Sequence, residues 1–137
     1  WQAELAKVGA PVPGVLHGNW LASSGHAAGL ELARRARAGE EVTAVFVAND
    51  QMALGLLNAM HREGLSVPGD VSVVGFDDIP EAAYFTPPLT TLRQDFAELG
   101  RRGVQLVLSR LRGEQSESQP VLPALVVRET TGPPPVR

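Results

Sequence analysis

Short apolar runs rich in β-branched residues alternate along this chain with longer helical segments. The runs that predict strands are 12–17, 43–48, 71–76, 90–93 and 125–127. Between them, apolar residues recur at helical spacing over 23–39, 50–63 and 95–112. Strands that alternate with helices of this length are typical of βαβ units, in which the strands are parallel. The alternation predicts an α/β fold with a doubly wound, mostly parallel sheet.

The composition narrows the function classes. The 137 residues are 44% hydrophobic and 20% charged, as in ordinary globular domains, and the net charge of -3 argues against a nucleic-acid-binding surface. The chain has no cysteine, so neither disulfides nor thiolate chemistry are expected. No run approaches the roughly 20 apolar residues of a membrane span, and no signal segment opens the chain. We expect a cytoplasmic protein without a membrane partner. Because it starts at Trp1, we also expect it to be a piece of a longer chain.

Polar side chains directly follow three of the predicted strands. Trp20 comes soon after the first, Asn49 and Asp50 follow the second, and Asp77 and Asp78 follow the third. The carboxyl ends of parallel strands share one edge of the sheet, where α/β proteins bind ligands. A carboxylate accepts hydrogen bonds from hydroxyls, an amide both donates and accepts, and an indole covers an apolar sugar face. This edge is therefore predicted to bind a small polyhydroxylated ligand.

Each of these residues also has a simpler structural explanation. Asn49 and Asp50 stand where a helix begins, and either can be its N-cap. Asp50 is the better candidate for the cap, because Asn49 follows the strand directly and is better placed for a ligand. Asp77 and Asp78 can form an Asx-turn before the proline that follows them. The indole of Trp20 can belong to the core. From the residues alone, these alternatives remain open.

No catalytic constellation is visible in the sequence. Adjacent carboxylates in an extended segment point in different directions, which makes 77 and 78 a poor acid–base pair. The histidines His17, His26 and His61 lack metal-ligand spacing, and Lys7 lies outside every predicted strand. There is no glycine-rich phosphate loop and no nucleophile elbow. We therefore expect neither an enzyme nor a metal nor a cofactor; a flavodoxin-like enzyme would need residues that are not found.

Three ordered segments resemble the LacI family of transcription regulators. They are Val47 to Gly55, Pro68 to Asp78 and Pro87 to Asp95, with a weaker match upstream at Asn19-Trp20 and Ser23-Ser24-Gly25. The resemblance covers the chain from Trp1 to about Thr131. It implies a periplasmic-binding-protein-like fold of type I, with this chain supplying the C-terminal subdomain and part of the N-terminal one.

The resemblance also implies how the chain is divided. Residues 1–92 would form the C-terminal effector-binding subdomain, and 93–119 would cross into the N-terminal subdomain and form a helix there. Residues 120–130 would return as a strand to the C-terminal subdomain. The segment 131–137 is expected to be a disordered tail.

Four residues match the family's effector site by position. Asn49 and Asp77 match residues that hydrogen-bond the effector, and Trp20 matches an aromatic residue that stacks on it. Gln94 matches a residue in the strand that crosses between subdomains, near the pocket. The implied effector is a sugar or sugar derivative, with a nucleoside or purine less expected.

Other positions match the family's dimer interface, namely Leu54, Ala82, Tyr84 and Phe85. The implied protein is a repressor that forms a homodimer and couples effector binding to operator affinity. Operator DNA would be contacted only by a helix-turn-helix that this chain lacks. The alternative from another class is a solute-binding receptor of a sugar transporter, which would share the fold but be exported and monomeric.

Overall fold

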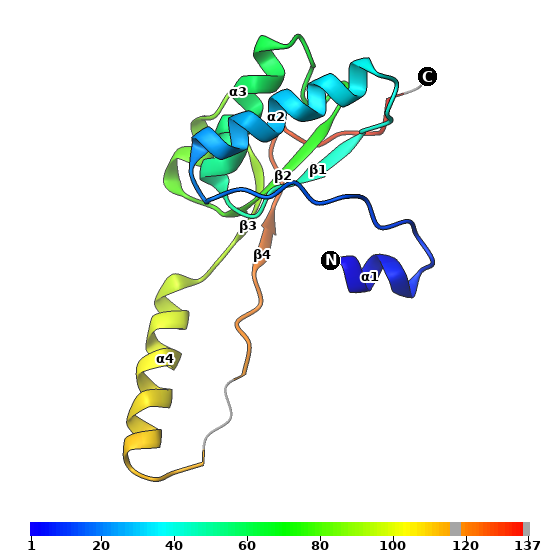
Figure 1. The fold of residues 1–137 in the computed structure, drawn as a ribbon. Helices are drawn as coiled ribbons and strands as arrows, with labels where there is room; N and C mark the ends of the chain where they lie inside the picture. The colour runs from blue at the N-terminus through cyan, green and yellow to red at the C-terminus, as the bar shows by residue number, and fades with distance from the viewer. Residues whose placement is uncertain (116–118, 136–137) are drawn as a thin grey trace.

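A four-stranded sheet lies at the centre of the computed structural model, which describes residues 1–115 and 119–135. The strands lie in the order of the chain: β1 (Ala44–Phe46), β2 (Ser72–Asp77), β3 (Thr90–Arg93) and β4 (Ala124–Val126). The first three are parallel and β4 is antiparallel to β3. Helix α3 (Asp50–Arg62) packs on β2, and α2 (Ala22–Arg37) packs on α3 (Figure 1). The predicted α/β fold with a mostly parallel sheet is confirmed.

Helix α3 supplies most of the core. Its buried residues Met52, Leu56, Ala59 and Met60 recur at helical spacing, and Met52, Leu56 and Met60 share one hydrophobic cluster with the fully buried Val73 of β2. Burying each large apolar side chain of this kind contributes about 1.5–3 kcal/mol. A 3₁₀ helix, Pro80–Tyr84, follows β2 and closes the core from the side.

Glycines let α2 and α3 approach closely. A Cβ atom on Gly25 would lie 1.9 Å from the carbonyl oxygen of Met52, and one on Gly55 would lie 1.8 Å from that of Ala22. Both distances are far below van der Waals contact, so the backbones touch where a side chain would separate them. This contact fixes α2, and the loop that precedes it, relative to the start of α3.

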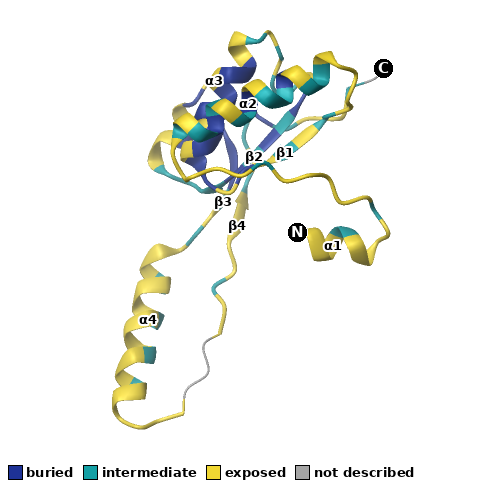
Figure 2. Cartoon of the chain, viewed as in Figure 1, coloured by how far each residue is buried: buried dark blue, intermediate teal, exposed yellow. Residues whose placement is uncertain are grey.

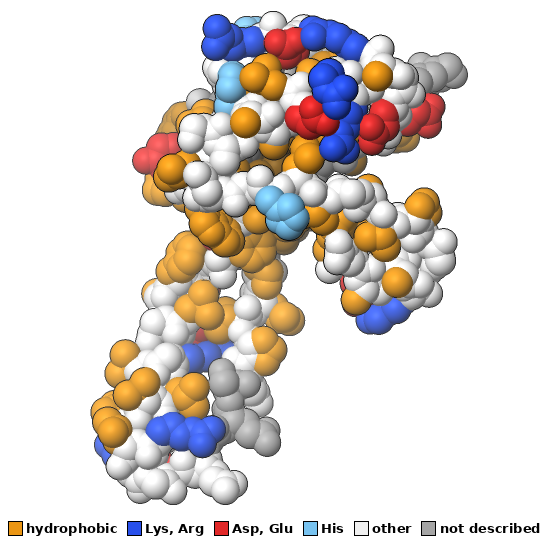
Figure 3. Space-filling view, viewed as in Figure 1, with side chains coloured by type: hydrophobic (Ala, Val, Ile, Leu, Met, Phe, Trp, Pro, Cys, Tyr) orange, Lys and Arg blue, Asp and Glu red, His pale blue; other side chains and the backbone are white. Residues whose placement is uncertain are grey.

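Helix α4 (Phe96–Leu111) leaves the sheet and, with the segment that returns to β4, forms an arm away from the core (Figures 1 and 2). Asp95 caps it, since its side chain accepts a hydrogen bond from the Glu98 amide at 2.9 Å. None of its residues is buried, and Val104, Val107 and Leu111 are among its exposed apolar side chains. Figure 3 shows hydrophobic side chains distributed along this arm.

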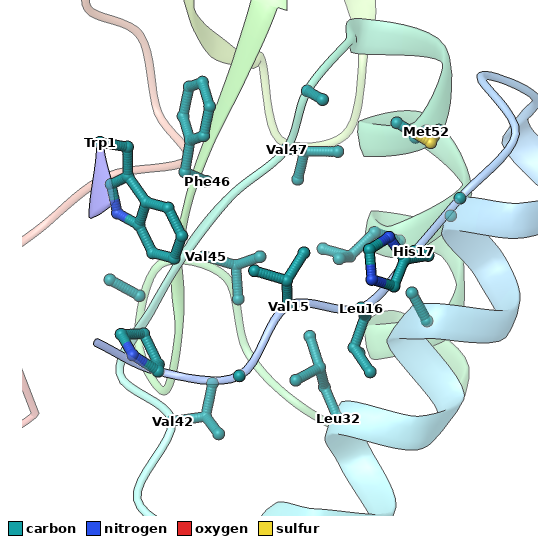
Figure 4. A pocket seen from close by; sticks show the side chains of 18 of the residues that line it. Trp1, Val15, Leu16, His17, Leu32, Val42, Val45, Phe46, Val47 and Met52 are labelled. Carbon is teal, nitrogen blue, oxygen red and sulfur yellow. The ribbon is translucent and has the colours of Figure 1, made fainter. Parts of the chain in front are cut away.

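The first predicted strand, 12–17, is wrong. This segment passes the edge of β1 without pairing, and a cavity of about 1150 Å³ lies between them, lined by apolar residues that include Val15, Leu16 and Val45 (Figure 4). Pro11 and Pro13 lack the amide hydrogens that a strand must donate, which explains why the apolar run does not join the sheet.

The predicted disordered tail, 131–137, starts at residues that the structure attaches to the sheet. Thr131 is hydrogen-bonded through its hydroxyl to that of Thr90 at 3.0 Å. The amide of Gly132 donates to the hydroxyl of Ser72, which lies on β2. These residues are therefore attached to the sheet. Residues 136 and 137 of the predicted tail lie outside the described residues, as do 116–118 of the predicted linker.

No helix within 1–115 or 119–135 is both long enough and apolar enough to cross a membrane. The helix α1 (Gln2–Lys7) lies apart from the sheet at the start of the chain (Figure 1).

Candidate functional site

Asp77 and Gln94 meet at the carboxyl ends of two neighbouring strands. In the parallel register of β2 and β3, Asp77 lies opposite Arg93, so Gln94 is the next residue beyond the pair. The Gln94 side-chain amide donates to Oδ1 of Asp77 at 2.7 Å. Only Oδ1 of Asp77 is used in this bond. Among the described residues, Oδ2 of Asp77 and the side-chain oxygen Oε1 of Gln94 therefore remain as acceptors for a ligand at the sheet edge.

Asn49 and Trp20 form a second pair at the same edge. The Asn49 side-chain amide donates to the Trp20 carbonyl oxygen at 3.1 Å and to Oε1 of Gln51 at 2.9 Å. Its oxygen accepts a hydrogen bond from the Met52 amide at 2.9 Å, so Asn49 is the N-cap of α3. The indole of Trp20 is 66% exposed, which excludes the core explanation and leaves its faces open to a ligand.

Asp50 is not the helix cap that the sequence favoured. It is fully buried, and its carboxylate accepts hydrogen bonds from the Thr91 hydroxyl at 2.6 Å and from the Ile79 amide at 2.9 Å. The cap position went to Asn49 because its extended backbone precedes the first helical residue, whereas Asp50 already belongs to the helix. The carboxylate of Asp50 connects α3, β3 and the loop after β2.

Burial raises the pKa of Asp50, and the charge of Asp77 acts in the same direction, while the hydrogen bonds from Thr91 and the loop backbone oppose the shift. The carboxylate lies so close to β2 that a Cβ atom on Gly75 would approach its Oδ1 to 2.3 Å. Gly75 is therefore needed for Asp50 to enter the sheet. Through Asp50, the start of α3, which carries Asn49, is linked to the loop that carries Asp77.

Three site residues have left-handed backbone conformations. The φ angles are 70° at Trp20, 112° at Asp77 and 57° at Asp78. Such conformations are uncommon for residues other than glycine and cost of order 1–3 kcal/mol each unless the surroundings fix them. Among the described residues the other positive φ values are at glycines, so these three unusual conformations are concentrated at the strand ends.

Asp78 is bound by two arginines. Its Oδ1 accepts from Nη2 of Arg128 at 2.6 Å and its Oδ2 from Nε of Arg93 at 2.5 Å. Burial acts to raise the pKa of Asp78, but the hydrogen bonds and charges of Arg128 and Arg93 outweigh it and lower the pKa. The hydrogen bonds described at these carboxylates are not those of an Asx-turn: Asp77 accepts from Gln94, and Asp78 accepts from Arg93 and Arg128.

The four residues assigned to a dimer interface differ in exposure. Leu54 is 45% and Tyr84 86% exposed, as a contact surface requires. Ala82 is fully buried and Phe85 is 8% exposed, so these two belong to the core of the chain itself. The sequence-based assignment was wrong for them, because the 3₁₀ helix that carries Ala82 turns it inward under Leu89, whose amide donates to the Ala82 carbonyl.

Sequence reasoning missed the residues that support the site. Asp50 was favoured as a cap and Asp78 was considered only as a residue of the ligand edge or of an Asx-turn, while Thr91 and Arg128 were given no role. Their partners are 15 to 50 residues away in the chain, and no local pattern announces such pairs. Within the part of the chain that the structure describes, no group of three or more histidine, aspartate or glutamate side chains is placed to hold a metal ion.

A family model described as a periplasmic binding protein-like domain matches residues 5–131. The chain belongs to this family. The predicted resemblance to the effector-binding domain of LacI-family regulators is confirmed as well. The chain is 42% identical over 115 residues to the lactose operon repressor of Escherichia coli (strain K12), which covers 83% of this chain but 31% of that protein.

Solved structures agree. A lac repressor dimer bound to operator and the anti-inducer ONPF matches with a TM-score of 0.83 and 37% identity, covering 96% of this chain and 45% of that one. A complex of the transcriptional regulator CelR with cellobiose matches with a TM-score of 0.80 and 37% identity, covering 94% and 40%. The chain thus spans about a third of the curated relative's length and less than half of these structures.

Proposed function

We propose that this chain is the effector-binding and dimerisation part of a LacI-type transcription repressor and that its effector is a sugar or sugar derivative. The observation that carries the proposal is the convergence of Trp20, Asn49, Asp77 and Gln94 at one sheet edge. A carboxylate, two amides and an open indole face supply the groups that sugar hydroxyls and a pyranose ring require. The CelR–cellobiose complex, a structural relative, supports this ligand class.

The arrangement of the chain supports a site between two subdomains. We assign 1–92 and 120–130 to one subdomain and 93–119 to the other. The chain leaves the sheet immediately after Gln94, one of the proposed ligand contacts, and α4 lies away from the core. A ligand held at this edge touches the point where the subdomains join, and can therefore favour one of their relative orientations.

The proposed partners are a second copy of the protein and operator DNA. Leu54 and Tyr84 are exposed apolar and aromatic side chains suited to a contact between copies. The relative crystallised as a dimer on its operator supports both partners. This chain has a negative net charge, so we propose that DNA contact is made by a segment outside it. We further propose a cytoplasmic protein without catalytic activity.

The test is titration calorimetry of the complete protein with galactose, glucose, lactose and cellobiose. Replacement of Asp77 by Ala removes a charged hydrogen-bond acceptor and should weaken the sugar that binds by at least ~1.5 kcal/mol, about tenfold. The control is Glu31→Gln on α2; among the described residues, the Glu31 carboxylate accepts hydrogen bonds from Arg34 and Arg35 of the same helix. Unchanged affinity in Asp77→Ala would remove Asp77 from the site.

A further inference from the structure

The carboxylate of Asp78 joins the end of β3 to the segment that follows β4. Arg93 is the last residue of β3, where the chain leaves toward α4. Arg128 lies two residues after the end of β4, beyond the strand that the returning chain forms beside β3. Both arginines bind the same carboxylate, which is 5% exposed. One buried anion therefore holds together the end of β3, the segment after β4 and the loop after β2.

Arg128 is itself fixed in place. Its Nη1 donates to the Leu89 carbonyl at 2.7 Å, and its amide donates to the Thr90 hydroxyl at 2.9 Å. Its side chain is 17% exposed, compared with 59% for Arg93. Charge-assisted hydrogen bonds are strongest where water is excluded. The bond between Asp78 and the largely buried Arg128 is therefore the stronger of the two, and the bond to Arg93 is the more accessible to solvent.

The cluster lies directly beside the proposed effector contacts. Asp78 follows Asp77 in the loop after β2, and Arg93 precedes Gln94 at the end of β3. The pair 78–93 and the pair 77–94 thus form two neighbouring links between the same two segments. Asp77 and Asp78 are adjacent in this loop and both have positive φ angles, so bonds that hold one carboxylate also restrain the backbone that carries the other.

We propose that Asp78 is a positioning residue for the effector site: its ion pairs with Arg93 and Arg128 hold Asp77 and Gln94 in the geometry that binds the ligand. Asp78 acts through its neighbours, since both of its carboxylate oxygens are already bound to arginines. This inference rests on the proposed function for its ligand, but its structural part, the fixing of the loop, holds whichever ligand binds.

The chain contains a matched control. Glu31 also accepts hydrogen bonds from two arginines, Arg34 and Arg35, but these belong to one turn of α2 and the Glu31 side chain is 33% exposed. Surface pairs of this kind contribute little and hold no separate segments together. Neutralising Glu31 removes the same charge and affects the same number of arginine partners, two, without touching the site.

The experiment compares Asp78→Asn, Arg93→Gln and Arg93→Lys with Glu31→Gln in the complete protein. Deuterium exchange is followed in peptides covering 71–79 and 89–95, and lactose and cellobiose are titrated by calorimetry. In Asp78→Asn, exchange in both peptides should rise about tenfold, and affinity for the bound sugar should fall at least about tenfold. Glu31→Gln should match the wild type in both measurements.

Arg93→Gln keeps the test decisive if Asp78→Asn does not fold, because Arg93 is largely exposed and its loss should leave the melting temperature unchanged. It should still weaken sugar binding about fivefold, and Arg93→Lys should restore most of the affinity. Wild-type affinity in Arg93→Gln, or wild-type exchange in Asp78→Asn, would overturn the proposal. If the wild type binds neither disaccharide, the sugar assignment fails, and the exchange measurement still decides whether Asp78 fixes the loop.

Discussion

Asn49 combines two functions that a pair of substitutions can separate. Its oxygen caps α3 through the Met52 amide, while its NH₂ group faces the Trp20 carbonyl at the proposed ligand edge. Asn49→Ser retains a good N-cap but is too short to reach Trp20 or a ligand. Asn49→Ala removes the cap as well. If Asn49 is only a cap, Asn49→Ser should keep most of the stability and of the sugar affinity. If Asn49 also binds the ligand, both variants should lose sugar affinity.

The magnitudes follow from the contacts that each variant loses. Asn49→Ala loses the cap, which is worth about 1 kcal/mol, and the bond to the Trp20 carbonyl, worth about 1 kcal/mol more. We expect its free energy of unfolding to fall by about 2 kcal/mol, since Asn49 is 6% exposed and water replaces little of what is lost. Asn49→Ser should lose only about half of that. Sugar affinity should fall by about tenfold or more in both, because both lack the amide.

Unfolding is measured with urea and binding by calorimetry on the complete protein. The decisive comparison is between stability and affinity: the two variants should differ in the first and agree in the second. If Asn49→Ser binds sugar like the wild type, or if affinity simply follows the free energy of unfolding, then Asn49 is a helix cap and not a ligand contact.

Three further predictions concern packing, pH and assembly. Gly55→Ala should destabilise the fold by ~3 kcal/mol in urea unfolding because its Cβ would overlap the Ala22 carbonyl, whereas Gly100→Ala on α4, which has open space, should be neutral or stabilising. The pKa of Asp50 is raised in the folded chain, so the folded state binds a proton more tightly than the unfolded one. The free energy of unfolding of the wild type, relative to that of Asp50→Asn, should therefore rise as pH falls through that pKa. A relative free energy of unfolding that falls with falling pH would contradict this. Leu54→Arg should weaken dimerisation in sedimentation by at least about tenfold, through a charge placed in an apolar contact, while sugar affinity stays unchanged.

The sheet was predictable because its information is local. The apolar runs at 71–76 and 90–93 and the helical spacing over 50–63 each carry their own signal, and the structure places β2, β3 and α3 there. The run 12–17 failed for a reason that is also in the sequence: two prolines remove the donors that a strand needs. Apolar content alone does not make a strand when the backbone cannot pair.

The candidate site could be placed from the sequence, but the contacts that support it could not. The rule that ligands bind where parallel strands end pointed to Asp77 and Asn49 as candidates. It could not decide which of Asn49 and Asp50 is the helix cap, because that choice depends on where the first helical turn begins. Nor could it find Arg128, whose bond to Asp78 spans 50 residues. Such a contact exists only after β4 has returned beside β3.

The position of Gln94 explains why binding and subdomain orientation would be coupled in this protein. Gln94 directly follows Arg93, the last residue registered to β2, and the next residue, Asp95, already caps α4. A ligand that contacts Gln94 and Asp77 therefore binds one residue before Asp95, the cap of α4. Asp78 also links the end of β3 to the segment after β4, through Arg93 and Arg128. Under the proposed function, the ligand contacts and the point where the chain passes from one subdomain to the other lie at the same strand ends. The ligand can therefore influence the other subdomain without a long chain of intervening residues.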